Sequence, residues 1–206
     1  MRRQRILTIC GIVLLLAGVI WTLRIPYYFH RSDAVGGDLL EQARAVVSTA
    51  PKEVPQTAPQ DAAALQPPAR APQAEPTAPF GVLQIPALKL QAPIVAGTAE
   101  RQISVAVGHF TGSAAPGTSG TALLAAHNAT WFRHLDRLQR GDTVLVSTAD
   151  GTYSYEVTEA RIVHVDDGVT KTRGPGLVLE SCYPLDALRQ TDYRYLVYAT
   201  AKKPGA

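Results

Sequence analysis

The residues of this chain that could best do chemistry are a thiol, an imidazole and a guanidinium. Cys182 ends the apolar run 177–181, Arg194 opens a second run twelve residues later, and His127 ends a third. A thiolate can attack a peptide carbonyl, an imidazolium can protonate the departing amine, and a guanidinium can stabilise the oxyanion between those steps. Together the three residue types predict a cysteine enzyme that transfers acyl groups.

Each of the three also has an ordinary structural interpretation. A single thiol is usually a small buried hydrophobe, a single histidine usually a hydrogen-bonded structural residue, and an arginine at a strand start usually a solvated charge. The other cysteine, Cys10, lies in the N-terminal apolar run, so Cys182 has no disulfide partner in the globular part. An unpaired thiol in an exported domain is exposed to oxidation, which favours a use for it.

Short β-branched runs broken by Gly and Pro fill the chain after Phe80 and are typical of strands. Apolar side chains at three-to-four-residue spacing predict one helix over residues 130–138. Many short strands with regularly spaced turns indicate a closed or sandwich-like β architecture, and we expect an all-β fold, an eight-stranded barrel with one or two short helices. The eight expected strands are residues 81–85, 92–95, 104–107, 121–126, 143–147, 152–164, 176–181 and 194–200.

The N-terminal segment, residues 1–30, is expected to anchor the chain in a membrane. Residues 6–23 are eighteen in a row without a charge, about the length that spans a bilayer core. A cleaved signal peptide is the alternative, but its apolar region would be shorter and no small-x-small cleavage site follows before Arg24. Arg2, Arg3 and Arg5 precede the span and predict a cytoplasmic N-terminus, with the rest of the chain on the other side.

Residues 31–79 are expected to join this anchor to a globular domain at residues 80–206. Residues 38–47 carry apolar side chains at helical spacing, with Asp38 as a candidate cap. Eight prolines mixed with Ala, Gln and Thr follow between residues 48 and 79, a composition that cannot bury a core. From residue 80 on, twelve Lys and Arg stand against eleven Asp and Glu, so nothing favours a nucleic-acid partner.

The globular part resembles the sortases, and in particular the class D branch and its relatives in Gram-negative bacteria. The sortase cysteine motif is usually Thr-Leu-x-Thr-Cys, and here residues 178–182 read Val-Leu-Glu-Ser-Cys, followed by Tyr-Pro. Residues 126–135 (AHNATWFRHL) resemble the sortase histidine strand and the Phe-Arg-x-Leu continuation after it. Residues 81–86 (GVLQIP), 92–95 (APIV), 107–110 (VGHF) and 194–197 (RYLV) match in the same order.

The resemblance implies a sortase-like β-barrel and a membrane-anchored cysteine transpeptidase. Such an enzyme cleaves a C-terminal sorting signal of a secreted or membrane protein and passes the acyl group to an amine of a cell-wall precursor or protein. It implies catalytic roles for Cys182 as nucleophile, Arg194 at the oxyanion and His127 as acid, and substrate contacts at Val178 and Ser181. His109 is interpreted as structural, because the family's catalytic histidine lies in the next strand.

No cofactor or metal is expected, since His127 and Cys182 lack further ligands at local spacing and no carboxylate cluster indicates calcium. Two other functions stay open. A hydrolytic cysteine peptidase of the same fold would use water in place of the amine. A stalked binding module would keep Cys182 as an inert buried thiol.

Overall fold

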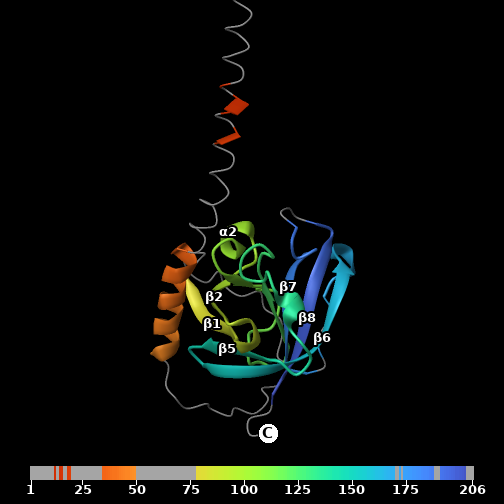
Figure 1. Cartoon of the computed structure of the whole chain (residues 1–206). Helices are drawn as coiled ribbons and strands as arrows, with labels where there is room; N and C mark the ends of the chain where they lie inside the picture. The colour runs from red at the N-terminus through yellow and green to blue at the C-terminus, as the bar shows by residue number, and fades with distance from the viewer. Residues whose placement is uncertain are drawn as a thin grey trace, which may run out of the picture. The chain divides into compact units, whose positions relative to one another are not determined.

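The protein folds as a closed eight-stranded barrel in the order β1-β2-β3-β4-β7-β8-β6-β5 (Figure 1). The structure, a computed structural model, describes residues 12, 14, 15, 18, 19, 34–49, 78–169, 172, 174–187 and 191–202. The strands are β1 (Pro79–Ile85), β2 (Leu90–Ala96), β3 (Val107–His109), β4 (Thr121–Ala125), β5 (Thr143–Thr148), β6 (Gly151–His164), β7 (Gly176–Tyr183) and β8 (Tyr193–Ala201). The predicted all-β barrel is therefore confirmed.

Short helical turns lie between the strands. They are the 3-10 turns η1 (Pro86–Leu88), η2 (Leu135–Arg137) and η3 (Val165–Asp167), and the one-turn helix α2 (Glu100–Ile103). None of the helices in the described part of the chain is long and apolar enough to cross a membrane. The predicted span at residues 6–23 falls outside the described residues except for the five helical positions 12, 14, 15, 18 and 19, and the proline-rich segment at 50–77 lies wholly outside them.

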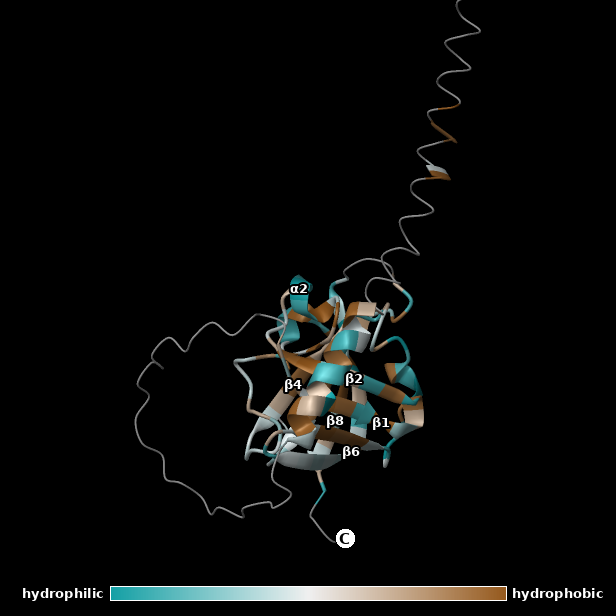
Figure 2. Cartoon of the chain, turned by 90° about the vertical axis from the view of Figure 1, so that its left-hand side faces the viewer, coloured by the Kyte–Doolittle hydropathy of each residue, from teal (hydrophilic) through white to brown (hydrophobic). Residues whose placement is uncertain are grey.

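The barrel interior is built from every second residue of each strand. Along β5, buried Val144 and Val146 alternate with half-buried neighbours, as a strand with one face on a core requires. The same alternation appears as brown and teal bands along the strand ribbons in Figure 2. On β7, Leu177 and Leu179 join the central core cluster, whereas Val178 belongs to a separate cluster on the other face with Leu196 and Tyr198 of β8.

Two of the predicted elements are wrong in detail. The strand expected at 104–107 is displaced, because residues 100–103 form α2 and the strand begins only at Val107. The helix expected at 130–138 is a series of turns ending in η2. Its backbone bonds explain the difference: the amide of Phe132 donates to the carbonyl of His127, and the amide of Leu135 donates to that of Phe132. No repeating four-residue ladder forms, although Phe132 and Leu135 are fully buried as their spacing indicated.

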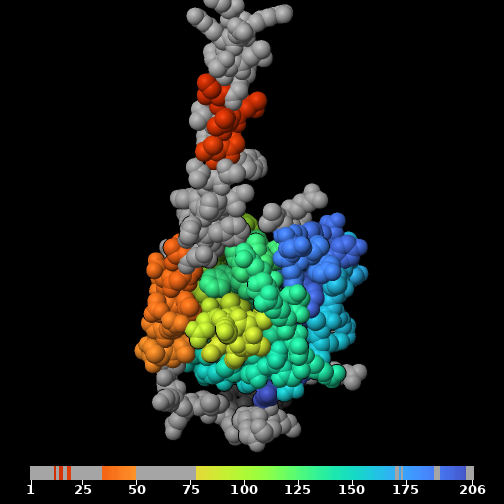
Figure 3. All heavy atoms as spheres, in the orientation of Figure 1, coloured from red at the N-terminus to blue at the C-terminus, as the bar shows by residue number. Residues whose placement is uncertain are grey.

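A helix over residues 34–48 packs on the barrel through residues 36–43. Leu39 clusters with Val95 of β2 and Ala106, and Ala43 is fully buried. A Cβ on Gly36 would lie 2.6 Å from Cζ2 of Trp131, so the close approach needs glycine. In Figures 1 and 3 this helix (orange) lies against the first strands of the barrel. The helix predicted at 38–47 is therefore present, and it begins before Asp38.

Candidate active site

Cys182 and Arg194 face each other across two hydrogen-bonded strands. In the antiparallel register of β7 and β8, Cys182 is paired directly with Arg194. Paired residues of neighbouring strands project from the same face of a sheet, with Cβ atoms about 4.5–5.5 Å apart. Because Leu177 and Leu179 take the inner face, period two puts Glu180 and Cys182 on the outer face. The thiol and the guanidinium thus share the outside of the barrel wall.

His127 reaches the same level from the other side of β7. The parallel register of β4 and β7 pairs Ala125 with Glu180, and it continues past the strand end. There the amide of Ala126 donates to the carbonyl of Glu180, and Oγ of Ser181 donates to the carbonyl of Ala126, both at 3.1 Å. Continued by one more residue, the same register would set His127 level with Cys182. The order β4, β7, β8 therefore brings the three predicted catalytic residues to one row.

The turn after β4 holds His127 in place. Its carbonyl accepts from the amide of Thr130 at 3.3 Å and from that of Phe132 at 3.2 Å, while the Phe132 ring is anchored in the core. On the side-chain end, Nε2 lies 3.1 Å from Oε1 of Glu100 in α2. The imidazole is about a quarter exposed, at 23%, so one edge is held and another remains open to solvent.

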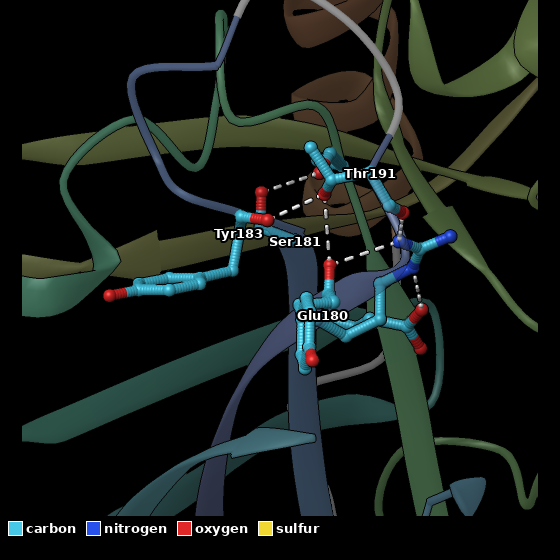
Figure 4. A network of polar contacts seen from close by, with 7 residues as sticks. Glu180, Ser181, Tyr183 and Thr191 are labelled. Carbon is cyan, nitrogen blue, oxygen red and sulfur yellow. Dashed lines mark hydrogen bonds and ion pairs between the residues drawn. The ribbon is translucent and has the colours of Figure 1, made fainter. Parts of the chain in front are cut away.

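Arg194 is held by three oxygen atoms. Its Nε lies 3.4 Å from Oε1 of Glu180, and its Nη1 donates to the carbonyls of Thr191 at 2.6 Å and Tyr193 at 3.0 Å. The Arg194 side chain is 14% exposed and that of Glu180 is 23% exposed. Burial raises the pKa of the Glu180 carboxyl above its usual value, and the positive charge of Arg194 opposes that shift. Figure 4 shows Glu180 and Thr191 within this network.

The connection between β7 and β8 is fastened beside the site. Thr191 Oγ1 donates to the carbonyl of Tyr183 at 2.5 Å (Figure 4). Asn128, next to His127 and only 5% exposed, donates both amide hydrogens, to the carbonyl of Pro184 at 3.1 Å and to that of Ala187 at 2.7 Å. The segment after the nucleophile is thereby tied to the segment after the histidine.

The two predicted substrate contacts occupy buried positions. Ser181 is 2% exposed and its hydroxyl is used by the carbonyl of Ala126, while Val178 is fully buried beside Leu196 and Tyr198. A substrate role for either stays a prediction. His109 is 8% exposed, and its Nε2 lies 2.9 Å from the carbonyl of Ala114, an arrangement that orders the loop after β3.

Three residues of the site went unrecognised in the sequence: Glu180, Asn128 and Glu100. Glu180 carried a signal, because it is the only charge in residues 176–183 and lies two positions before Cys182, hence on the same face. Asn128 follows the candidate histidine in a polar turn, a weaker signal. Glu100 is 27 residues from His127 in sequence, and nothing local indicated their contact.

Comparison with known proteins gives the same family throughout. Residues 83–202 match the family model of the sortase domain. Sortase D of Bacillus subtilis (strain 168) is 32% identical over 121 residues, which are 57% of this chain and 61% of that protein. The aligned region thus spans less than two thirds of that relative.

Two solved structures show the same likeness in three dimensions. Sortase C1 from Streptococcus agalactiae has a TM-score of 0.55 at 28% identity, covering 61% of this chain and 68% of that one. The catalytic domain of SrtD from B. anthracis has a TM-score of 0.54 at 28% identity, covering 66% of this chain and 95% of that one. Since the family model alone accounts for more than half of the residues, the chain belongs to the sortase family.

Proposed function

We propose that this protein is a cysteine transpeptidase that cleaves a C-terminal sorting signal of secreted or membrane proteins and transfers the new carboxyl end to an amine. The observation that carries the proposal is the direct register of Cys182 with Arg194 across β7 and β8, with His127 following Ala126, whose amide and carbonyl bond to Glu180 and Ser181 of β7. A nucleophile, an anion-stabilising donor and a proton carrier on the outer face of the barrel wall are the parts that acyl transfer needs.

In the first half-reaction the thiolate of Cys182 attacks the carbonyl carbon of the scissile peptide bond. The oxyanion that forms accepts a hydrogen bond from Arg194. The carbon–nitrogen bond then breaks, the departing amine takes a proton from His127, and a thioester to Cys182 remains. Because Arg194 and Cys182 are paired across β7 and β8, the guanidinium is near the carbonyl without a conformational change.

In the second half-reaction an incoming amine attacks the thioester. It gives up a proton to His127, now a neutral imidazole, and the thiolate of Cys182 leaves. The acceptor is an amine of a cell-wall precursor or of another protein. With water in place of the amine, the same steps would make the protein a hydrolytic peptidase.

The location is part of the same proposal. The uncharged run at residues 6–23, with arginines before it, supports a single membrane span with a cytoplasmic N-terminus and the barrel on the extracytoplasmic side. Proline-rich residues 50–77 would act as a stalk. Protease digestion of sealed vesicles from cells expressing the full chain tests this orientation, because an extracytoplasmic barrel is digested only in right-side-out vesicles.

Replacing Cys182 with alanine tests the chemistry. The wild-type chain is incubated with a library of fluorogenic peptides from C-terminal sorting signals, with and without triglycine as acceptor, and intact-protein mass spectrometry follows the acyl adduct. We expect wild type to carry the adduct and to form the triglycine product. Cys182→Ala should do neither while keeping its circular dichroism spectrum, because the lost sulfur has no chemical substitute.

The outcomes separate the three functions. Wild-type turnover in Cys182→Ala would refute a cysteine mechanism. An adduct that yields only the hydrolysed product at any triglycine concentration would identify a peptidase. Failure of iodoacetamide to label Cys182 in the folded chain, with no adduct, would identify a binding module.

A further inference from the structure

The contacts of Arg194 leave one nitrogen of its guanidinium available. An arginine has five N–H donors, one on Nε and two on each Nη. Here Nε forms an ion pair with Oε1 of Glu180 at 3.4 Å, and the two hydrogens of Nη1 match the two carbonyls that it contacts, those of Thr191 and Tyr193. Among the residues that the structure describes, Nη2 has no hydrogen-bond partner. The guanidinium is therefore held through Nε and Nη1, and Nη2 carries two hydrogens that no described residue accepts.

Glu180 occupies a position where a carboxylate is costly. Its neighbours in register are Ala125 on β4 and Leu196 on β8, and the adjacent outer-face residue Val178 is fully buried. A partly buried carboxylate is tolerated only when it is paired and hydrogen-bonded. Among the described residues its one ion pair is with Arg194, so the carboxylate and the guanidinium depend on each other.

We infer that Glu180 is a positioning residue, which orients Arg194 so that Nη2 is the atom that donates to the substrate oxyanion. The inference rests on the proposed function, because it assigns a geometry to the oxyanion donor named there. Hydrogen bonds to two backbone carbonyls fix the position of Nη1, but the rest of the guanidinium could still rotate around that nitrogen. The contact at Nε removes this freedom, since a planar fork fixed at two of its nitrogens has its third fixed as well.

The consequence for catalysis is a loss in turnover more than in substrate affinity. An oxyanion exists only after attack on the carbonyl, so a misaligned donor raises the barrier of that step. Misplacement of a donor by about 1 Å can cost on the order of 10²-fold in rate. We expect Glu180→Gln, which keeps the shape but loses the charge, to lower kcat by roughly 10-fold with little change in KM. Glu180→Leu, which loses the acceptor as well, should lower kcat further.

The rate should also depend on pH in a way that identifies Glu180. Its pKa lies above that of an ordinary glutamate, so on acidification it is protonated earlier than an exposed carboxyl and releases Nε of Arg194. In the part of the chain that the structure describes, the charged and titratable groups on its face are Arg194 and Tyr198 on β8 and Cys182 on its own strand, with His127 beyond the end of β4. In wild type, kcat should therefore fall on the acid side through a step that is absent from the profile of Glu180→Gln.

The experiment compares kcat, KM, the pH profile of kcat and the melting temperature for wild type, Glu180→Gln and Glu180→Leu. It uses the full chain in detergent, with the library peptide that wild type cleaves fastest as the probe. Glu159→Gln is the matched control, because Glu159 pairs with Arg161 at 2.7 Å on β6, with both side chains about half exposed. It removes a Glu–Arg pair of the same barrel, and its kcat should stay within about twofold of wild type, as expected for an exposed pair.

A second comparison shows whether Glu180 acts through Arg194. In an Arg194→Lys background the added change Glu180→Gln should have almost no further effect on kcat, because the guanidinium that Glu180 orients is already absent. Additive losses, or a change in KM alone, would overturn the inference and make Glu180 a residue that contacts substrate.

The proposed function and the positioning role of Glu180 would be contradicted by different results. If Arg194→Lys keeps wild-type kcat, the oxyanion role of Arg194 in the proposed function is wrong. If Arg194→Lys is severely impaired but Glu180→Gln keeps both wild-type kcat and the acid step of the profile, only the positioning role is wrong. Should Glu180→Leu fail to fold, Glu180→Gln still decides, because it changes the shape of the side chain least.

Discussion

Alternate residues of β7 serve two purposes, and the division follows from the two-residue period of a strand. Leu177 and Leu179 fill the barrel, and the buried hydroxyl of Ser181 ties β7 to the chain beyond β4. Glu180 and Cys182 point the other way and meet Arg194. Replacement of the family's usual threonine by Ser181 keeps that hydroxyl, so a short polar side chain before the nucleophile is explained by strand pairing alone.

The contacts of Arg194 predict that lysine cannot replace it. An ammonium group is a point charge on a flexible stem, and it cannot meet Glu180, two carbonyls and an oxyanion together as a planar fork does. Removal of one oxyanion donor costs about 10²–10³-fold in turnover, and we expect Arg194→Lys to lose activity on that scale.

Steady-state rates of Arg194→Lys and Arg194→Ala on one peptide, with thermal melts to exclude misfolding, check this expectation. A loss of less than about tenfold in both variants would move Arg194 from the oxyanion to substrate positioning or to simple surface charge.

At the scale of the elements, the sequence predicted the strands that residue alternation and composition indicate. It did not predict the elements whose position depends on loops and on pairing with distant strands. Seven of the eight expected strands overlap the observed ones over most of their length, because β-branched runs bounded by turns are local signals. The strand at Val107–His109 was misplaced, since its three residues pair with β2 and β4, far away in sequence. The turns at 128–134 were taken for a helix because Phe132 and Leu135 have helical spacing, although backbone bonding there is irregular.

The site shows the same division. The three catalytic candidates lie at strand ends that composition could locate, and the antiparallel return brought Cys182 opposite Arg194 as the sequence indicated. The contacts that orient them, from Glu100, Glu180 and Asn128, depend on which strands become neighbours. The barrel order decides that, and no local pattern encodes it.

Asn128 predicts how the two catalytic segments are held together. Its buried amide is the donor for two carbonyls after Cys182, so Asn128→Ala leaves both without that partner. The carbonyl of Pro184 still accepts from the amide of Ala187, so the variant loses two hydrogen bonds without burying an unpaired group. A hydrogen bond contributes about 0.5–1.5 kcal/mol, and we expect urea denaturation to show a loss of about 1–3 kcal/mol. Gln139→Ala, at an exposed position, is the control and should stay within about 0.5 kcal/mol of wild type. Equal stabilities of the two variants would show that the loop is held without Asn128.

At the scale of the whole molecule, the globular part is more than the barrel. The stripe Gly36, Leu39 and Ala43 meets β2 and Trp131, and Arg44 Nη2 donates to Oε1 of Gln91 at 2.5 Å. A helix that precedes the proline-rich residues is thus part of the same packing as the strands that follow them. The helix at residues 34–48 thus contributes to the packing of the domain, and a linker role for the proline-rich residues after it stays a prediction.

Truncation separates these two roles. The barrel has its own closed sheet and core, so a fragment beginning at Pro79 should fold alone, as the sequence predicts for a domain at residues 80–206. It should melt below a fragment that begins at Arg31, because Leu39 is 8% exposed and its burial is worth about 1.5–3 kcal/mol. For a domain of this size that difference corresponds to roughly 5–10 °C in Tm.

Leu39→Ala in the longer fragment should reproduce most of the drop, and Val46→Ala, at a position 38% exposed, should reproduce little of it. Circular dichroism melts of the four proteins decide the matter. If the fragment from Pro79 is unfolded while that from Arg31 is folded, the domain begins at the helix and the boundary at residue 80 is wrong. If the fragments from Pro79 and from Arg31 have the same Tm and Leu39→Ala does not change it, the helix contributes no stability and residues 31–79 act as a linker throughout.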